Sequence, residues 1–324
     1  MKKVLLIGVA LIGIVAAFLL VKKSGRVDAP SGMTAAIPAQ PQSPIKPNSQ
    51  PDPKLKSAER IPLPQPVVPE FNAGLVPAHL HPLLGWQNTG GYVPRRRLVE
   101  SLGQNLSADE IRALVMFLYA KPHQVGLAES DYNAVGDVVL LKLEDQKQLP
   151  ADYTDHLVVM FYDQSRNHTW RDYCIQHLGT VYQRTPEEKR PVIRQLYEDA
   201  LKPGSTFAGT TLLSMKRSAG TADLPKEFVA EKAMAVASSD AFGDAERLSA
   251  LHVAAEFNHP DAVKLARQIV SSKHTTLFRS ASLAVIGMAG DETDKPLLEK
   301  YVKSSDIRLR VSAVEALKKL VEHD

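Results

Sequence analysis

From about residue 95 onward, apolar side chains recur every three or four positions, the spacing of one face of an α-helix. A clear example follows Ser107, which has N-cap chemistry and precedes Asp109 and Glu110 in the first turn. Similar stretches predict helices near residues 131–143, 152–163, 168–182, 187–201, 206–217 and 225–238, and then to the end of the chain. No apolar alternation flanks a hairpin turn, so the pattern predicts an all-α body.

Three arginines in the C-terminal part mark a repeat. Arg247, Arg279 and Arg310 are 32 and 31 residues apart. Each is followed by a small residue three positions on and by a branched apolar residue four positions on. These pairs are Ala250 with Leu251, Ser282 with Leu283, and Ala313 with Val314. Small residues beside an apolar stripe let neighbouring helices approach closely, so the pattern predicts a repeated helix pair.

The repeated unit resembles HEAT repeats of the short bacterial class related to phycobilin lyase repeats. The family pattern is an Asp, an Arg a few residues on, and then Ala-x-x-Ala-Leu. The matching residues here are Asp306, Arg310, Ala313, Ala316 and Leu317. The resemblance implies an α-solenoid with a concave surface for partners, and it implies no particular reaction. In such a stack we expect Leu251, Leu283 and, one step along in the last unit, Leu317 to point into one continuous core.

The resemblance covers the C-terminal half of the chain. It is clearest over residues 247–322, and weaker copies that start at Arg171 and Ala208 extend it over 165–324. Residues 95–164 are expected to be helical, but they are too irregular to divide into repeats.

The N-terminal 26 residues have the pattern of a membrane anchor. Val4–Val21 contains 18 residues without a charge, or roughly 27 Å of helix against a hydrocarbon core of about 30 Å. Lysines flank both ends. A cleaved signal peptide is the alternative, although its apolar region is usually shorter and followed by a small-x-small cleavage site. By analogy with bacterial signal anchors, we expect a single-pass inner-membrane protein with its body in the periplasm; the cleaved form would be periplasmic or secreted.

Residues 27–94 are predicted to be a proline-rich, disordered linker. Fourteen of the 22 prolines lie between Pro30 and Pro94, and proline removes an amide donor and fixes φ. The simplest role is a spacer, and a docking site for a proline-recognising module is the alternative. Phe71–Trp86 is less polar, and it is the part of the linker that could fold onto the body.

The charge distribution argues against nucleic-acid binding. Residues 1–100 hold 12 Lys and Arg against 5 Asp and Glu, whereas the remaining 224 residues hold 27 against 31. The predicted folded body is therefore mildly acidic, while a nucleic-acid binder usually has a basic face.

Candidate chemical groups are few, and each has a structural interpretation. Arg247, Arg279 and Arg310 could form a ligand ladder, but such residues more often bond within their repeat. Cys174, the single cysteine, and His177 share a helical face and could form a nucleophile pair. However, Cys174 occupies a small-residue core position of a repeat, which favours packing.

Metal and cofactor motifs are also weak. His79 and His81 could contribute to a metal site, but two histidines do not complete one. Ser43–Lys46 fits Ser-x-x-Lys only within the linker. The sequence has no phosphate loop, dinucleotide fingerprint, Gly-x-Ser-x-Gly or His-Glu metal motif.

The sequence therefore predicts a membrane-tethered scaffold that presents a HEAT-like solenoid to a protein partner. We expect no catalytic, metal or cofactor residues, no nucleic acid and no small-molecule substrate. The binding residues, the partner and the oligomeric state are left open. The alternatives are an enzyme or enzyme accessory of the lyase-related class, and a structural spacer of the cell envelope.

Overall fold

The computed structural model of the chain describes residues 60–87 and 90–322, and their ordered elements are helices. The α-helices are α2 (Tyr92–Ser101), α3 (Ala108–Tyr119), α4 (Glu129–Glu144), α5 (Tyr153–Tyr162), α6 (His168–Val181), α7 (Arg190–Ala200), α8 (Ala208–Ser218), α9 (Lys226–Ser238), α10 (Asp244–Glu256), α11 (Ala262–Val270), α12 (Thr276–Ala289), α13 (Lys295–Val302) and α14 (Ile307–Glu322). The 3-10 helices are η1 (Ala73–Leu75), η2 (Ala78–Leu80), η3 (Pro122–Val125), η4 (Tyr182–Arg184), η5 (Glu187–Lys189) and η6 (Glu292–Asp294).

The all-α prediction is confirmed for the described residues, in which the only strand-like feature is an isolated bridge between Thr221 and Leu224. The helices expected from the apolar period lie where α3 to α9 begin and end, within a few residues. The Ser107 cap is also observed: its hydroxyl accepts from the Glu110 amide, and the Glu110 carboxylate accepts from the Ser107 amide. Local signals therefore determine these helix starts.

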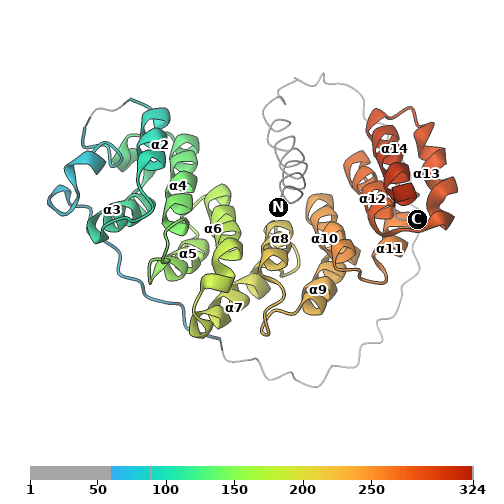
Figure 1. The fold of residues 1–324 in the computed structure, drawn as a ribbon, viewed down its shortest axis with the longest axis horizontal. Helices are drawn as coiled ribbons and strands as arrows, with labels where there is room; N and C mark the ends of the chain where they lie inside the picture. The colour runs from blue at the N-terminus through green and yellow to red at the C-terminus, as the bar shows by residue number, and fades with distance from the viewer. Residues whose placement is uncertain (1–59, 88–89, 323–324) are drawn as a thin grey trace, which may run out of the picture. The chain divides into compact units, whose positions relative to one another are not determined.

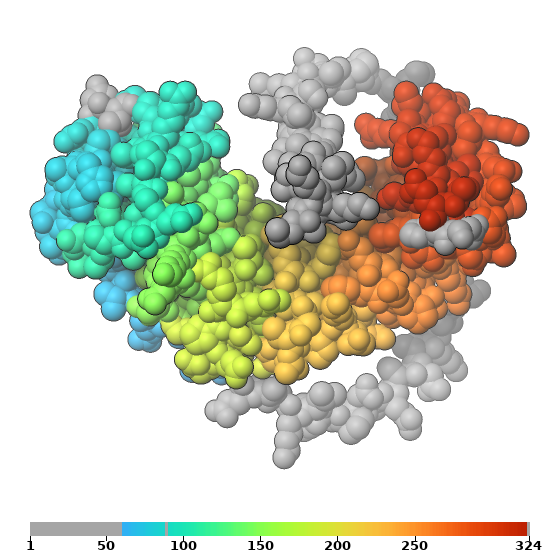
Figure 2. Space-filling model, viewed as in Figure 1, coloured from blue at the N-terminus to red at the C-terminus, as the bar shows by residue number. Residues whose placement is uncertain are grey.

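From α3 to α14 the helices are arranged in pairs that follow one another in chain order (Figure 1). We call α4, α6, α8, α10, α12 and α14 the even layer, and α5, α7, α9, α11 and α13 the odd layer. Successive helices of the even layer pack directly against each other, whereas contacts along the odd layer are sparse. In the space-filling view the segments from α4 to α14 abut one another in chain order (Figure 2). Each repeat register lies in an even-layer helix.

Small residues explain the close packing of the even layer. A Cβ added to Gly179 of α6 would lie 2.7 Å from the Cα of Ser214 in α8. At the first of these contacts, between α4 and α6, Gly136 lies under the ring of Trp170. At Gly179 the two backbones therefore approach closely, whereas at Gly136 the absent side chain leaves room for the indole ring of Trp170.

The ordered body begins earlier than predicted. Residues 60–87 and 90–94, assigned to the linker by their prolines, form an extended segment over 60–70, then η1 and η2, and the first residues of α2. The apolar side chains Leu80, Leu83 and Leu84 are buried, as expected for the less polar stretch Phe71–Trp86. The buried Arg95 guanidinium then donates to the carbonyl of Val125, 2.5 Å away. Proline content alone therefore placed the linker boundary too far along the chain.

The predicted anchor Val4–Val21 and the linker up to residue 59 lie outside the described residues. Among the helices that the structure describes, none is both long and apolar enough to cross a membrane.

Candidate functional site

The arginines that mark the repeats bind within their own helix pair. Each donates to a main-chain carbonyl at or just beyond the C-terminal end of the preceding helix. The bonds are Arg171 Nε to Phe161 O (2.7 Å), Arg247 Nε to Ala237 O (3.0 Å), Arg279 Nε to Val270 O (3.0 Å) and Arg310 Nη1 to Ser304 O (2.9 Å). The last carbonyls of a helix lack partners and carry partial negative charge, so a guanidinium stabilises that end. The arginine ladder is thus structural.

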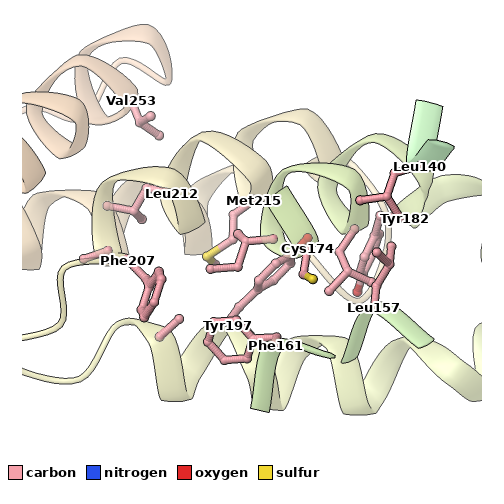
Figure 3. Packing of buried hydrophobic residues seen from close by; sticks show 14 of the residues in the cluster. Leu140, Leu157, Phe161, Cys174, Tyr182, Tyr197, Phe207, Leu212, Met215 and Val253 are labelled. Atoms are coloured by element: carbon pink, nitrogen blue, oxygen red, sulfur yellow. The ribbon is translucent and has the colours of Figure 1, made fainter. Parts of the chain in front are cut away.

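Cys174 is fully buried in α6, among core side chains that include Leu157, Tyr197 and Met215 (Figure 3). Burial raises the pKa of its thiol to about 12. The nucleophilic thiolate is therefore negligible at neutral pH, and the side chain acts as a small apolar group.

His177 is held by two carboxylates of α4 and not by the thiol. Its Nδ1 lies 2.6 Å from Glu144 Oε2, and its Nε2 lies 3.2 Å from Asp137 Oδ1. Burial opposes the charged imidazolium, but the hydrogen bonds and charges of Asp137 and Glu144 outweigh it and raise the pKa of His177. Since both ring nitrogens are engaged, neither is left to activate Cys174.

The two histidines of the predicted linker face different partners. His79 Nε2 lies 3.1 Å from Glu110 Oε1, whereas His81 Nε2 lies 3.1 Å from the carbonyl of Val76. Among the described residues there is no group of three or more His, Cys, Asp or Glu side chains placed to hold a metal ion. The arrangement does not bring His79 and His81 together as ligands.

A groove lies between α7 and α9, where the odd layer is loosely packed. Its volume is about 710 Å³. Met215 of α8 and Tyr197 of α7 are buried side chains along it, and Phe228 of α9 is 39% exposed at its edge. Pro191, Leu201, Leu224 and Pro225 add further apolar surface. Concave apolar surface with a few polar groups is typical of a binding site.

Charged side chains line the edge of this groove. The carboxylate of Asp199 accepts from Tyr162 Oη at 2.7 Å and from Arg60 Nη2 at 2.8 Å, and Lys202 Nζ lies 2.6 Å from its other oxygen. Burial alone would raise the pKa of Asp199, but hydrogen bonds from Lys202 and Tyr162 lower it below its usual value. Asp199 therefore stays ionised at neutral pH. Across the groove, the ammonium of Lys232 lies 5.2 Å from the centre of the Phe228 ring.

The N-terminal end of the described chain is hydrogen-bonded beside this groove. The side-chain amide of Gln195 accepts from the Ile61 N–H (2.7 Å) and donates to the Ile61 carbonyl (3.1 Å). We call residues 60–70, which run extended past α7 and α5 (blue in Figure 1), the strap. The sequence gives no local sign of this contact, because 134 residues separate Ile61 from Gln195. On α7, moreover, Gln195 and Asp199 look like any solvated polar face.

Comparison with known proteins agrees with the repeat pattern. A family model described as HEAT repeats matches residues 230–318, from within α9 to within α14. No curated protein and no solved structure matches the chain. The all-helical arrangement of the described residues is consistent with an α-solenoid. The family match and the helix pairs together support a HEAT-repeat protein.

Proposed function

We propose that this protein is a membrane-tethered scaffold without enzymatic activity, which binds a protein partner through its helix-pair body. The observation that carries the proposal is the groove between α7 and α9, with Tyr197 and Met215 along it and Phe228 exposed at its edge. Aromatic side chains beside a recess, framed by charged groups, are the usual anchors of protein interfaces. HEAT repeats commonly mediate contacts between proteins, which supports the same role.

The tether is part of the proposal. The uncharged run Val4–Val21 is long enough to span a bilayer, and basic residues flank it. We place the body in the periplasm of a bacterial cell, where tethering would raise the local concentration for partners at the same membrane. We assign the repeats to the short bacterial class related to phycobilin lyases on the pattern Asp306–Leu317. This resemblance does not imply lyase activity.

Site-specific crosslinking in intact membranes tests this function. A photoreactive phenylalanine analogue at Phe228 should yield a discrete adduct with one partner protein. The same analogue at Leu277 of α12, which is 37% exposed against 39% for Phe228, is the matched control and should not yield that adduct.

A charge reversal at the groove strengthens the test. Lys232→Glu, introduced beside the crosslinker, should reduce the adduct, since Lys232 lines the same groove. If positions 228 and 277 give the same adducts, or if neither gives one in membranes that contain the full-length chain, the groove is not the partner site and the proposal fails.

A further inference from the structure

We infer that the surface beneath Arg60 and Ile61 is a peptide-recognition site for an arginine followed by an aliphatic residue and a proline, and that the strap is its built-in occupant. The inference rests on the proposed function, because it names the chemistry of a partner segment at the edge of the same groove. Two subsites, one for a guanidinium and one for a main-chain amide, carry it.

The guanidinium subsite is formed by α5 and α7. Arg60 Nη2 donates to Asp199 Oδ2 at 2.8 Å, and its Cζ lies 5.5 Å from the centre of the Tyr162 ring. The phenol of Tyr162 donates to that same carboxylate oxygen. The acceptor is therefore held in place by the protein itself. A fixed carboxylate beside an aromatic ring favours a planar, charged guanidinium.

The main-chain subsite is the side-chain amide of Gln195. It bonds both the N–H and the C=O of one residue, Ile61. This requires an extended backbone and an amide hydrogen, so proline is excluded at that position and accepted at the next, where Pro62 stands. The Gln195 amide therefore recognises the main chain at the position of Ile61. Asp199 and Tyr162 recognise the side chain of the residue before it.

The strap holds its position loosely. The side chain of Arg60 is 62% exposed, and Val67 and Val68 are 79% and 50% exposed. Only the prolines at 64, 66 and 69 are partly buried between Ile61 and Glu70. Since so little of the strap is buried, a partner segment with the same chemistry is able to compete with it.

Open space on either side of Arg60 gives a partner more surface than the strap uses. A recess of about 300 Å³ lies toward Phe161 and Phe207, and the α7–α9 groove lies on the other side. Arg60, Asp199 and Lys202 line both. A longer segment that replaces Arg60 and Ile61 would therefore gain contacts in one or both recesses. This gain would offset the advantage that the strap has from being in the same chain.

The test uses full-length protein in detergent and a fluorescent peptide of residues 60–66, Arg-Ile-Pro-Leu-Pro-Gln-Pro, added in trans. The double variant Arg60→Ala/Ile61→Pro removes the guanidinium and the amide hydrogen of the strap. Because the strap no longer occupies the site, the double variant should bind the peptide at least about tenfold more tightly than the natural chain does.

The receptor residues are then changed in this released background. Asp199→Asn and Gln195→Ala should each weaken peptide binding by about tenfold or more. Glu188→Gln, at an exposed carboxylate ahead of α7, is the matched control and should leave binding unchanged. A peptide with Glu in place of its Arg should not bind. Thermal unfolding of each variant checks that its fold is intact. Asp199→Asn tests the guanidinium subsite, and Gln195→Ala tests the main-chain subsite.

Several outcomes would overturn the inference. They are an absence of peptide binding to the released chain, equal binding of the Glu-substituted peptide, and insensitivity to both receptor variants. Concentration-dependent dimers of the natural chain that disappear with Arg60→Ala/Ile61→Pro would instead assign the site to strap exchange between two copies. The Phe228 crosslink does not depend on the Arg60 site. An adduct without peptide binding would reject this inference alone, whereas loss of the adduct would reject the proposed function.

Discussion

Gly287 of α12 lies directly against Ala316 of α14: a Cβ added to the glycine would be 2.4 Å from the Cα of the alanine. No side chain fits between the two backbones at this point. The close packing of α12 on α14 therefore requires glycine at position 287, because every other residue has a Cβ there.

Gly287→Ala should destabilise the protein, because α12 and α14 must move apart. We expect a loss of about 1–3 kcal/mol, typical of overpacking, measured by urea unfolding. Gly103→Ala is the control, since an added Cβ there has no atom closer than 3.9 Å; it should change stability by less than about 0.5 kcal/mol. Equal stability of Gly287→Ala and the natural chain would mean that α12 and α14 are not in close contact.

Cys174 should be inert in the native state. A bulky thiol reagent at pH 8 should modify it only after unfolding, because it is fully buried and its pKa is raised to about 12. Cys174→Ala with Thr180→Cys, which moves the thiol to an exposed position on the same helix, should react within the mixing time. Rapid labelling of native Cys174, or loss of a specific activity with the fold unchanged in Cys174→Ala, would favour the enzyme alternative.

His177 should make a pH-dependent contribution to stability. Its pKa is raised in the folded state by Asp137 and Glu144, so the folded chain binds its proton more tightly than the unfolded chain does. The contribution is therefore fully present below the unfolded value of about 6.5 and is lost as the pH rises through the higher folded value.

The difference in stability between the natural chain and His177→Gln measures this contribution. The difference should be largest near pH 5.5 and should shrink above neutrality. His156 and His252, whose pKa values burial lowers, act in the opposite direction in both proteins and cancel in the difference. A difference that grows as the pH rises would show that His177 is neutral in the fold.

Leu283→Ala should cost about 2–5 kcal/mol, the usual loss at a fully buried leucine. Hydrogen exchange should show lost protection in α10 and α14 as well as in α12, because α12 packs on both neighbours. Leu317→Ala should cost less and should affect α13 and α14 first. Uniform loss of protection throughout the body with Leu317→Ala would indicate one cooperative globular domain in place of a repeat stack.

Leu317 also shows where sequence reasoning failed. The repeat register predicts it in the core with Leu251 and Leu283, which are buried, but Leu317 is only partly buried. Leu317 follows Arg310 by seven residues, one step along from the position of Leu251 and Leu283. In addition, α14 is the last helix of the described row and has an even-layer neighbour on one side. The repeat register determines which face of its helix a side chain occupies. Whether that side chain is buried also depends on whether another helix packs against that face.

The helices and their pairing could be predicted because their signals are local or periodic. Ser107 with Glu110 marks a helix start, and the spacing of Arg247 and Arg279 marks the repeat. The candidate site could not be found in this way. Ile61 and Gln195 meet only because an irregular segment returns across α7, and no period or motif relates residues so far apart. Proline content obscured the strap further, because a docked extended segment and a free one have the same composition.

The position of the strap also determines where mechanical tension would act on the body. A pull through the residues before Arg60 would reach the body at α7, in the middle of the row, and not at α2. The three hydrogen bonds at Arg60 and Ile61 would be loaded in place of the buried contacts of a helix. Their release would lengthen the connection by up to roughly 35 Å over residues 60–70 while every helix stays folded. Release of the strap would thus lengthen the connection between the N-terminal segment and the helical body without unfolding a helix.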